Sequence, residues 1–463
     1  MPDLRDHEEV LRQAVRRLAE HSPFAESMAA TTHGETVSVD SKSRSTERPA
    51  RISGAAFRAW AGDRWVEGAT SSFDPASVRS AVEGLLPALR AGSKGPPPGE
   101  SSTTVGRADT PPGRPMHDLG TEELVARVEE MRSWIGGPAS IKVSFAQVQW
   151  GESERLYLNS TGANCFQRVY RTHLAIGAIA SENGKTQQEM FGAGGLGGQE
   201  LLDRVDQHKA LDVATTVVSL LSAKEPPTGR MNVIFDPGVT ATFAHESFGH
   251  GTEGDQFVRK RSYLLPLLGK SVAPEFLTLV DDGSLPGAWG SVAFDDEGHP
   301  GARTVLIDHG RFVSGLYDRE SAAAMGSHPT GNTRRAGFLD RAFVRMTNTL
   351  VEPGDRTRDE LIEEAKDGVV LERWLSGMED PAGGQMQIKV ARGHRIENGK
   401  MTDLLGPMAL SGKVLDVLRN VKGISGASDF EMTPGFCGKG HGDYLPVGDG
   451  GSYVLTQAVV GPA

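Results

Sequence analysis

The chain has 463 residues, of which 38% are hydrophobic and 24% are charged, a balance typical of a globular protein with two or three domains. No run approaches about 18 consecutive apolar residues, which argues against a membrane span. The charged N-terminal segment lacks the apolar core of a secretory signal. The formal net charge of −11 repels phosphate backbones, so nucleic acid is a poor candidate partner. Two cysteines are too few for a disulfide framework, which favours a cytoplasmic location.

The first ninety residues (1–90) predict an α/β unit. Apolar residues recur on one helical face between Leu4 and Leu18. Two β-like runs, 56–60 and 64–68, flank a turn and predict a hairpin. Asp74 followed by Pro75 predicts a helix start, because Asp is a favoured N-cap and Pro is favoured at the first helical position.

Three further segments complete the expected organisation. Residues 91–115 are rich in Gly, Pro, Ser and Thr, a composition that predicts a linker. Residues 116–228 predict a central α/β unit, with strand-like runs at 141–150, 155–159, 169–180 and 185–192. Residues 229–463 predict a mostly β domain that opens with a buried strand ending at Phe235. The expected fold class is α+β, with an α/β N-terminal half and a mostly β C-terminal half.

The helix that follows Phe235 carries the strongest chemical signal. It contains His245-Glu246 and a second histidine, His250. Imidazoles bind Zn²⁺ through a ring nitrogen, and an adjacent Glu can take a proton from water at the metal. Residues five apart lie about 140° apart on an ideal α-helix, so both histidines reach one metal only if the helix widens to a π-turn or ends there. Gly249 offers backbone freedom at this point.

A cysteine near the C-terminus is the candidate third ligand of a metal bound by this helix. Cys437 lies in a Gly-rich turn that also holds His441, a competing ligand. A catalytic zinc site needs three protein ligands, and a thiolate favours zinc over magnesium or calcium. Cys165 has no such context and is interpreted as a core thiol. The competing interpretation of His245 and His250 is two ordinary helix-end histidines.

These motifs resemble the TldD/PmbA family of metallopeptidases, also called modulators of DNA gyrase. The resemblance rests on His245-Glu246 to His250, on Glu253-Gly254-Asp255 and on Cys437-Gly438-Lys439. Further similar stretches follow in the same order along the C-terminal half. They are 281–286, 295–298, 329–332, 345–349, 383–385 and 396–400.

The resemblance implies a site and a catalytic type. His245, His250 and Cys437 would ligate one Zn²⁺ per chain, and Glu246 would be the general base. Because the chain keeps these residues, it is similar to the catalytic TldD-like members rather than the TldE-like members, which lack them. Glu253 and Asp255 are candidates to orient the imidazoles. Tyr444, His441 and Arg334 are candidates to stabilise an oxyanion.

The resemblance also implies a substrate and a partner. Family members cleave unfolded or extended peptides, including leader segments of precursor peptides, which enter as an added strand. They pair as dimers, so we expect a homodimer or a heterodimer with a TldE-like partner. Two alternatives remain open: a peptide-binding subunit of such a complex that does not hydrolyse, and a zinc hydrolase acting on a non-peptide amide.

Overall fold

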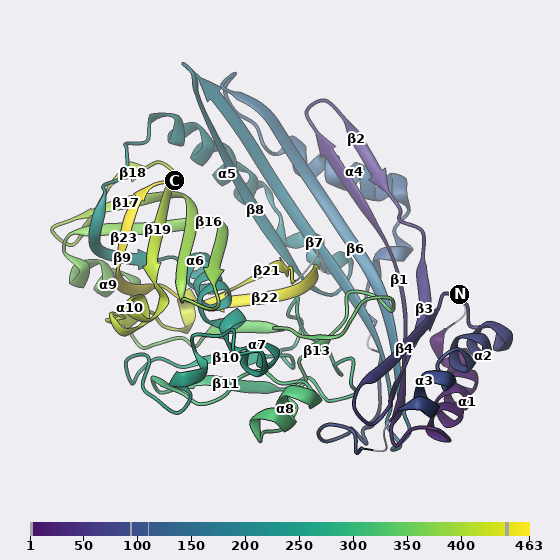
Figure 1. The fold of residues 1–463 in the computed structure, drawn as a ribbon. Helices are drawn as coiled ribbons and strands as arrows, with labels where there is room; N and C mark the ends of the chain where they lie inside the picture. The colour runs from purple at the N-terminus through teal and green to yellow at the C-terminus, as the bar shows by residue number, and fades with distance from the viewer. Residues whose placement is uncertain (1–2, 93–94, 110, 440–443) are drawn as a thin grey trace.

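The computed structural model describes residues 3–92, 95–109, 111–439 and 444–463. A large twisted sheet forms the N-terminal half, and the C-terminal half packs against it as a compact set of shorter strands (Figure 1). This arrangement confirms the α+β class, with a C-terminal half that is mostly β. None of the described helices has the length and apolar character needed to cross a membrane.

The sheet of the N-terminal half joins segments from both sides of residues 91–115. Its order is β4-β3-β1-β6-β7-β5, with β2 beside β1 and β8 beside β7. The pairing of β1 with β6 runs from Glu26↔Asn159 to Asp40↔Phe145, so the first ninety residues and the central segment share one sheet. The strands are β1 (Ala25–Asp40), β2 (Arg44–Glu47), β3 (Ile52–Trp60), β4 (Trp65–Thr70), β5 (Val105–Asp109), β6 (Ile141–Asn159), β7 (Asn164–Glu182) and β8 (Lys185–Leu196).

The structure confirms some of the local elements predicted for this half and differs from others. The expected hairpin is confirmed as β3 paired with β4, and the Asp74 side chain caps α2 by accepting from Ala76 N and Ser77 N. Two differences appear. The runs expected at 141–150 and 155–159 form one strand, β6, and the expected linker contributes β5, which pairs parallel with β7. Residues 151–154 are a glycine followed by polar residues, without the apolar alternation typical of a strand, so the sequence does not reveal that β6 is continuous.

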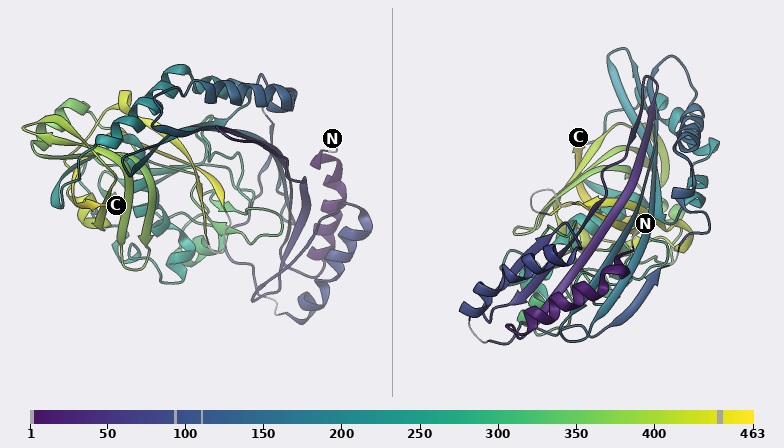
Figure 2. Two further views of the ribbon diagram at one scale, coloured as in Figure 1. Left: turned by 90° about the horizontal axis from the view of Figure 1, so that it is seen from above. Right: turned by 90° about the vertical axis from the view of Figure 1, so that its right-hand side faces the viewer.

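The two faces of the large sheet have different coverings. Because side chains alternate along a strand, Ala25 and Ala29 of β1 pack beneath the helices, whereas Met28 and Ala30 face Phe338 of the C-terminal half. Figure 2 shows the helices on one side of the sheet and the C-terminal half on the other. The helices are α1 (Glu8–Ala19), α2 (Pro75–Glu83), α3 (Leu86–Ala91), α4 (Thr121–Ser133) and α5 (Gln207–Ser219).

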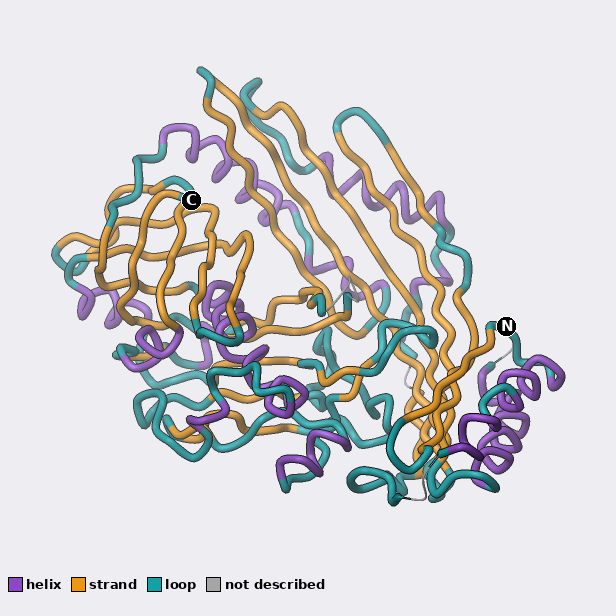
Figure 3. Tube along the Cα trace, viewed as in Figure 1, coloured by secondary structure: helices purple, strands orange, loops and turns teal. Residues whose placement is uncertain are grey.

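A closed ring of strands forms one layer of the C-terminal half. The order is β16-β9-β23-β19-β17, and β17 pairs back with β16 (Figure 3). Closure pairs both edges of β16 over Gly368–Leu371, whereas, within the described part of the chain, residues 372–380 pair only with β17. The strands of this layer are β9 (Gly229–Phe235), β16 (Gly368–Asp380), β17 (Gln385–Glu397), β18 (Lys400–Leu405), β19 (Met408–Lys413), β20 (Gly423–Ile424) and β23 (Val454–Pro462).

A six-stranded sheet lies beside the ring, in the order β12-β11-β10-β15-β22-β21. Its last two strands form a hairpin that supplies part of the functional site. The strands are β10 (Leu279–Asp282), β11 (Arg303–Asp308), β12 (Arg311–Phe312), β15 (Asn348–Val351), β21 (Glu431–Cys437) and β22 (Leu445–Gly451), with β13 (Thr333–Arg334) and β14 (Phe343–Val344) as a separate pair. The remaining helices are α6 (Pro237–Thr242), α7 (Gly254–Val258), α8 (Arg319–Met325), α9 (Arg358–Ala365) and α10 (Val414–Arg419).

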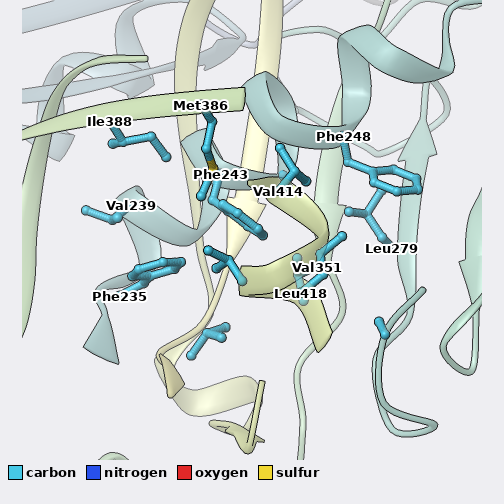
Figure 4. Close-up of a cluster of buried hydrophobic side chains, with 14 of the residues drawn as sticks. Phe235, Val239, Phe243, Phe248, Leu279, Val351, Met386, Ile388, Val414 and Leu418 are labelled. Atoms are coloured by element: carbon cyan, nitrogen blue, oxygen red, sulfur yellow. The ribbon is translucent and has the colours of Figure 1, made fainter. Parts of the chain in front are cut away.

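The segment that follows β9 crosses the hydrophobic core of the C-terminal half. Phe243 and Phe248 are buried and belong to one cluster with Met386 of β17 and Leu279 of β10 (Figure 4). Burying two aromatic side chains contributes roughly 3–6 kcal/mol of transfer free energy. The core therefore fixes this segment on both sides of His245 and Glu246.

Buried ion pairs join the two halves. Glu297 of the C-terminal half accepts from Arg58 of β3 at 2.7 Å and from the main-chain N–H of Arg319 at 3.0 Å. Arg58 also bonds Glu26 of β1. Burial acts to raise the pKa of Glu297, but the positive charges of Arg58 and Arg319 outweigh it and lower the pKa below its ordinary value.

Glu297→Gln should destabilise the protein in a pH-dependent way. Removing one partner of a buried ion pair typically costs about 3–5 kcal/mol. Because the folded state lowers the pKa of Glu297, its contribution is present above the ordinary value of 4.5 and is lost as the pH falls below it. Urea unfolding at pH 7 and at low pH measures both effects. Glu67→Gln, at an exposed carboxylate 4.0 Å from Arg58, is the control. Equal losses for the two variants at pH 7 would contradict this role.

Candidate metal centre

The end of β9 determines where the site begins. The Asp236 side chain accepts from Val239 N at 2.7 Å, and Pro237 occupies the first position of α6. This combination is a favourable helix start directly after a buried strand. The helix α6 continues without interruption into the π-helix η5 (Phe243–Gly249), which carries His245 and Glu246.

The π-helix brings the two histidines together. The main-chain N–H of His250 donates to the carbonyl of His245, which is the i→i+5 bond of a π-turn. The imidazole ring centres lie 5.1 Å apart with their planes at 89°. The spacing requirement inferred from the sequence is therefore met. A short 3₁₀ turn, η6 (His250–Thr252), then ends the helical segment.

Gly249 has a different role from the expected one. Its φ of −54° and ψ of −55° are ordinary helical values, so backbone freedom is not needed there. A Cβ atom at this position would lie 2.1 Å from Sδ of Met346. Gly249 thus provides space for the π-helix to pack against Met346.

Cys437 reaches the histidines from a distant part of the chain. It is the last residue of β21, is 4% exposed, and its Sγ lies 3.5 Å from Nε2 of His250. One ligand atom from each of His245, His250 and Cys437 lies within 4.8 Å of the others. The three residues predicted as ligands are thus gathered in one cluster that could hold a metal ion.

The thiol of Cys437 and the two imidazoles shift one another's pKa. Burial acts to raise the pKa of the Cys437 thiol, but the two imidazoles lower it well below its ordinary range. In turn, burial acts to lower the pKa of His250, yet the thiolate raises it to about 10. The site therefore stabilises a thiolate beside two imidazoles, which is the deprotonated sulfur that a metal requires.

Carboxylates behind the histidines orient both rings. Asp449 of β22 bonds Nδ1 of His245 through Oδ1 at 2.8 Å, which leaves Nε2 of that ring free for a metal. Glu253 lies 3.6 Å from Nδ1 of His250. Lys439 donates to Glu253 and Asp255, each at 2.8 Å, and to the carbonyl of Val344. This lysine ties the turn after Cys437 to the helical segment.

Glu246 lies beside the cluster in a cavity of about 360 Å³ that His250 also lines. Strand β16 forms one wall, and a Cβ at Gly377 would lie 2.5 Å from Cγ of Glu246. Glu379, two residues further along β16, faces the same cavity. Its carboxyl oxygens are buried without a partner among the described residues, and burial raises its pKa to about 8.

The other residues singled out in the sequence lie in different surroundings. Cys165 is a buried thiol whose pKa is raised to about 11 by burial, as a core cysteine should be. Arg334 is buried, donates to the carbonyls of Met346 and Pro446, and does not line the cavity of Glu246. Tyr444 is 66% exposed near Gly438. His441 lies outside the described residues.

Asp449 and Glu379 were not identified as site residues from the sequence. Each is an acidic residue in a strand with no neighbouring motif, and only the pairing of strands brings it to the site. A weak signal exists for Asp449, because a carboxylate among glycines inside a strand (448–451) is unusual.

The donor set fits zinc. Two imidazole nitrogens and one thiolate sulfur suit Zn²⁺ and are poor ligands for Mg²⁺ or Ca²⁺. Three protein ligands leave a fourth tetrahedral position, and the carboxylates of Glu246, Glu253 and Asp449 balance the charge of a dication. An α+β fold with such a cluster beside a carboxylate-lined cavity is the combination expected of a metallohydrolase.

Comparison with known proteins agrees with this class. Residues 228–460 match the PmbA/TldA metallopeptidase C-terminal domain, and residues 114–221 match the central domain of the same family. A metalloprotease of Methanothermobacter thermautotrophicus is 37% identical over 368 residues, which cover 78% of this chain and 79% of that protein. A zinc metalloprotease TldD homologue of Saccharolobus solfataricus is 33% identical over 242 residues, 52% of this chain and 53% of that protein.

Solved structures share the fold. The crystal structure of TldE from Thermococcus kodakarensis superposes with a TM-score of 0.74 at 18% identity, over 98% of this chain and 100% of that one. The C-terminal match alone spans half of the chain. The chain therefore belongs to the PmbA/TldD family of metallopeptidases, as its motifs predicted.

Asp449→Asn should weaken zinc binding without removing a ligand. The amide loses the negative charge that holds Nδ1 of His245, and loss of such a partner typically costs about 10- to 100-fold in metal affinity. Competition with a chromophoric chelator measures the affinity. Asp416→Asn, the same change at an exposed residue of α10, is the matched control. An Asp449→Asn affinity equal to that of the control would show that Asp449 does not support the ligand.

Proposed function

We propose that this protein is a zinc-dependent peptidase of the catalytic TldD-like type. The observation that supports it best is the convergence of His245, His250 and Cys437 within 4.8 Å, with Glu246 in the adjoining cavity. These three residues would hold one Zn²⁺ per chain, and Glu246 would act as general base. The metalloprotease names of the relatives favour a peptide bond over other amides.

The residues divide the chemistry between them. Bound Zn²⁺ would polarise the scissile carbonyl and lower the pKa of a water molecule. A carboxylate oxygen of Glu246 takes the proton of the attacking water and passes it to the nitrogen of the leaving amine. Asp449 keeps the proton of His245 on Nδ1, so that Nε2 stays directed to the metal. The backbone of Gly377 packs on Cγ of Glu246 and limits its rotamers.

An extended or unfolded peptide is the substrate that suits the surroundings of the site. Strand β16 pairs with β9 only over Gly368–Leu371, so the stretch 372–380 has one edge without a strand partner among the described residues. Such an edge can bind a peptide as an added strand. Met378, 68% exposed, lies in this stretch and lines the cavity of Glu246. Leader or precursor peptides satisfy the same requirement.

Dimerisation and a cytoplasmic location belong to the same proposal. The shared fold with TldE of Thermococcus kodakarensis supports pairing with an identical chain or with a TldE-like chain. The thiolate of Cys437 favours a reducing compartment, in which it stays available to the metal. The net charge of −11 argues against nucleic acid as a partner.

Glu246→Gln should abolish peptide cleavage while zinc stays bound. Loss of a general base lowers kcat about 10²- to 10⁴-fold, because the amide cannot accept the proton of water. Cleavage of an unstructured peptide, followed by mass spectrometry beside a zinc assay, measures both properties. Glu320→Gln, on an exposed face of α8, is the control.

Two results would favour the alternatives. A wild-type protein that binds zinc but cleaves no peptide, alone or with a TldE-like partner, would point to a non-hydrolytic peptide-binding subunit. A Glu246→Gln variant with wild-type cleavage would reject the assigned base.

A further inference from the structure

A second cavity, of about 50 Å³, lies between the two halves of the molecule. Arg155 of β6 and Arg171 of β7 line it from the large sheet, and Arg334 of β13 lines it from the C-terminal half. The other charged residues in its lining are Asp295 and Asp296. The cavity is separate from the one that contains Glu246 and His250, since the two share no lining residue.

Two of the three guanidinium groups bond only to main-chain carbonyls. Arg171 donates to the carbonyls of Trp289 and Ser291 at 2.9 and 3.0 Å, and Arg334 to those of Met346 and Pro446 at 2.7 and 2.8 Å. Within the described ranges, neither has a carboxylate within ion-pair distance. Arg334 is 6% exposed. A buried charge without a counter-charge is costly, so this arrangement is unusual.

The two carboxylates in the lining are already engaged. Oδ2 of Asp296 accepts from Arg155 and from the main-chain N–H of Arg335. Both oxygens of Asp295 accept from main-chain N–H groups, at 2.8 to 3.0 Å. Burial raises the pKa of Asp295 well above its ordinary value, which further reduces the negative charge available.

The charges of the lining do not cancel. Three guanidinium groups and two carboxylates line the cavity, so the lining itself carries an excess of positive groups. Burial and the neighbouring Arg334 and Arg155 lower the pKa of Arg171 to about 9. Burial and the neighbouring Arg345 and Arg155 lower the pKa of Arg334 to about 10. A single monovalent anion would remove the imbalance.

We propose that this cavity is a binding site for one small monovalent anion, held by Arg171 and Arg334 between the two halves. A volume of about 50 Å³ accommodates a chloride ion or one carboxylate group. The bound anion accepts hydrogen bonds from guanidinium groups that belong to different halves. It therefore ties the large sheet to the segment 334–346 that leads to β15, beside the metal centre.

Anion-dependent thermal stability tests this site directly. Melting temperatures are compared in sodium chloride, bromide, formate and gluconate at one ionic strength. A ligand that binds only the folded state raises Tm in a saturable way, here by on the order of 2 °C in chloride or bromide relative to the much bulkier gluconate. A rise in formate as well identifies a carboxylate as an acceptable occupant; a rise with halides alone identifies an inorganic ion.

Variants and crystallography locate the effect. Arg171→Met and Arg334→Met each remove one guanidinium but keep much of its volume, and should lose the anion-specific rise whatever their own Tm. Arg64→Met, at an exposed arginine, should keep it. Bromide-soaked wild-type crystals should give an anomalous peak between Arg171 and Arg334. A wild-type Tm that is the same in chloride and gluconate, a rise retained in both Arg171→Met and Arg334→Met, or no bromide peak in this cavity would each overturn the proposal.

Discussion

The hydrogen bond from the N–H of His250 to the carbonyl of His245 is the interaction on which the site depends. Five residues of α-helix would direct the two imidazoles to different faces, whereas the π-turn brings them onto one. Packing maintains this unusual turn. Phe243 and Phe248 lie in the core, Tyr263 donates its hydroxyl to the carbonyl of Ser247 at 2.9 Å, and Met346 fills the space at Gly249. The π-helix is thus a property of the whole C-terminal core rather than of local propensity.

The proposed third ligand, Cys437, and the carboxylate that orients His245 come from one hairpin. Strands β21 and β22 deliver Cys437 and Asp449, and Lys439 connects the turn between the strands to Glu253 and Asp255. Parallel pairing of β22 with β15 fixes this hairpin to the sheet that packs beside the π-helix. A buried thiolate, two imidazoles and surrounding carboxylates are stable together only because each charge has a neighbour of opposite sign. The site is therefore electrostatically prepared for a dication before one binds.

The sequence predicted the parts of this protein that local signals determine. Spacing required that the helix either widen to a π-turn or end between His245 and His250, and the α2 start at Asp74-Pro75 and the β3–β4 hairpin follow from capping and turn residues. The proposed ligand Cys437 could be identified from the sequence because a cysteine among glycines is conspicuous. Asp449, Glu379 and the single sheet shared by residues on both sides of 91–115 were not predictable, since they depend on which strands pair across more than a hundred residues. Gly249 illustrates the same limit: the position was noticed, but its reason is the sulfur of Met346.

Zinc content tests the proposed ligands His245, His250 and Cys437. Elemental analysis of the purified protein should give about one zinc per chain in the wild type, because two imidazoles and a thiolate complete a catalytic zinc site. His250→Ala and Cys437→Ala should each lose the metal. Cys165→Ala, which removes the other buried cysteine, should retain it. Full zinc occupancy in Cys437→Ala, or none in the wild type after zinc is supplied, would contradict the assignment of these three residues as ligands.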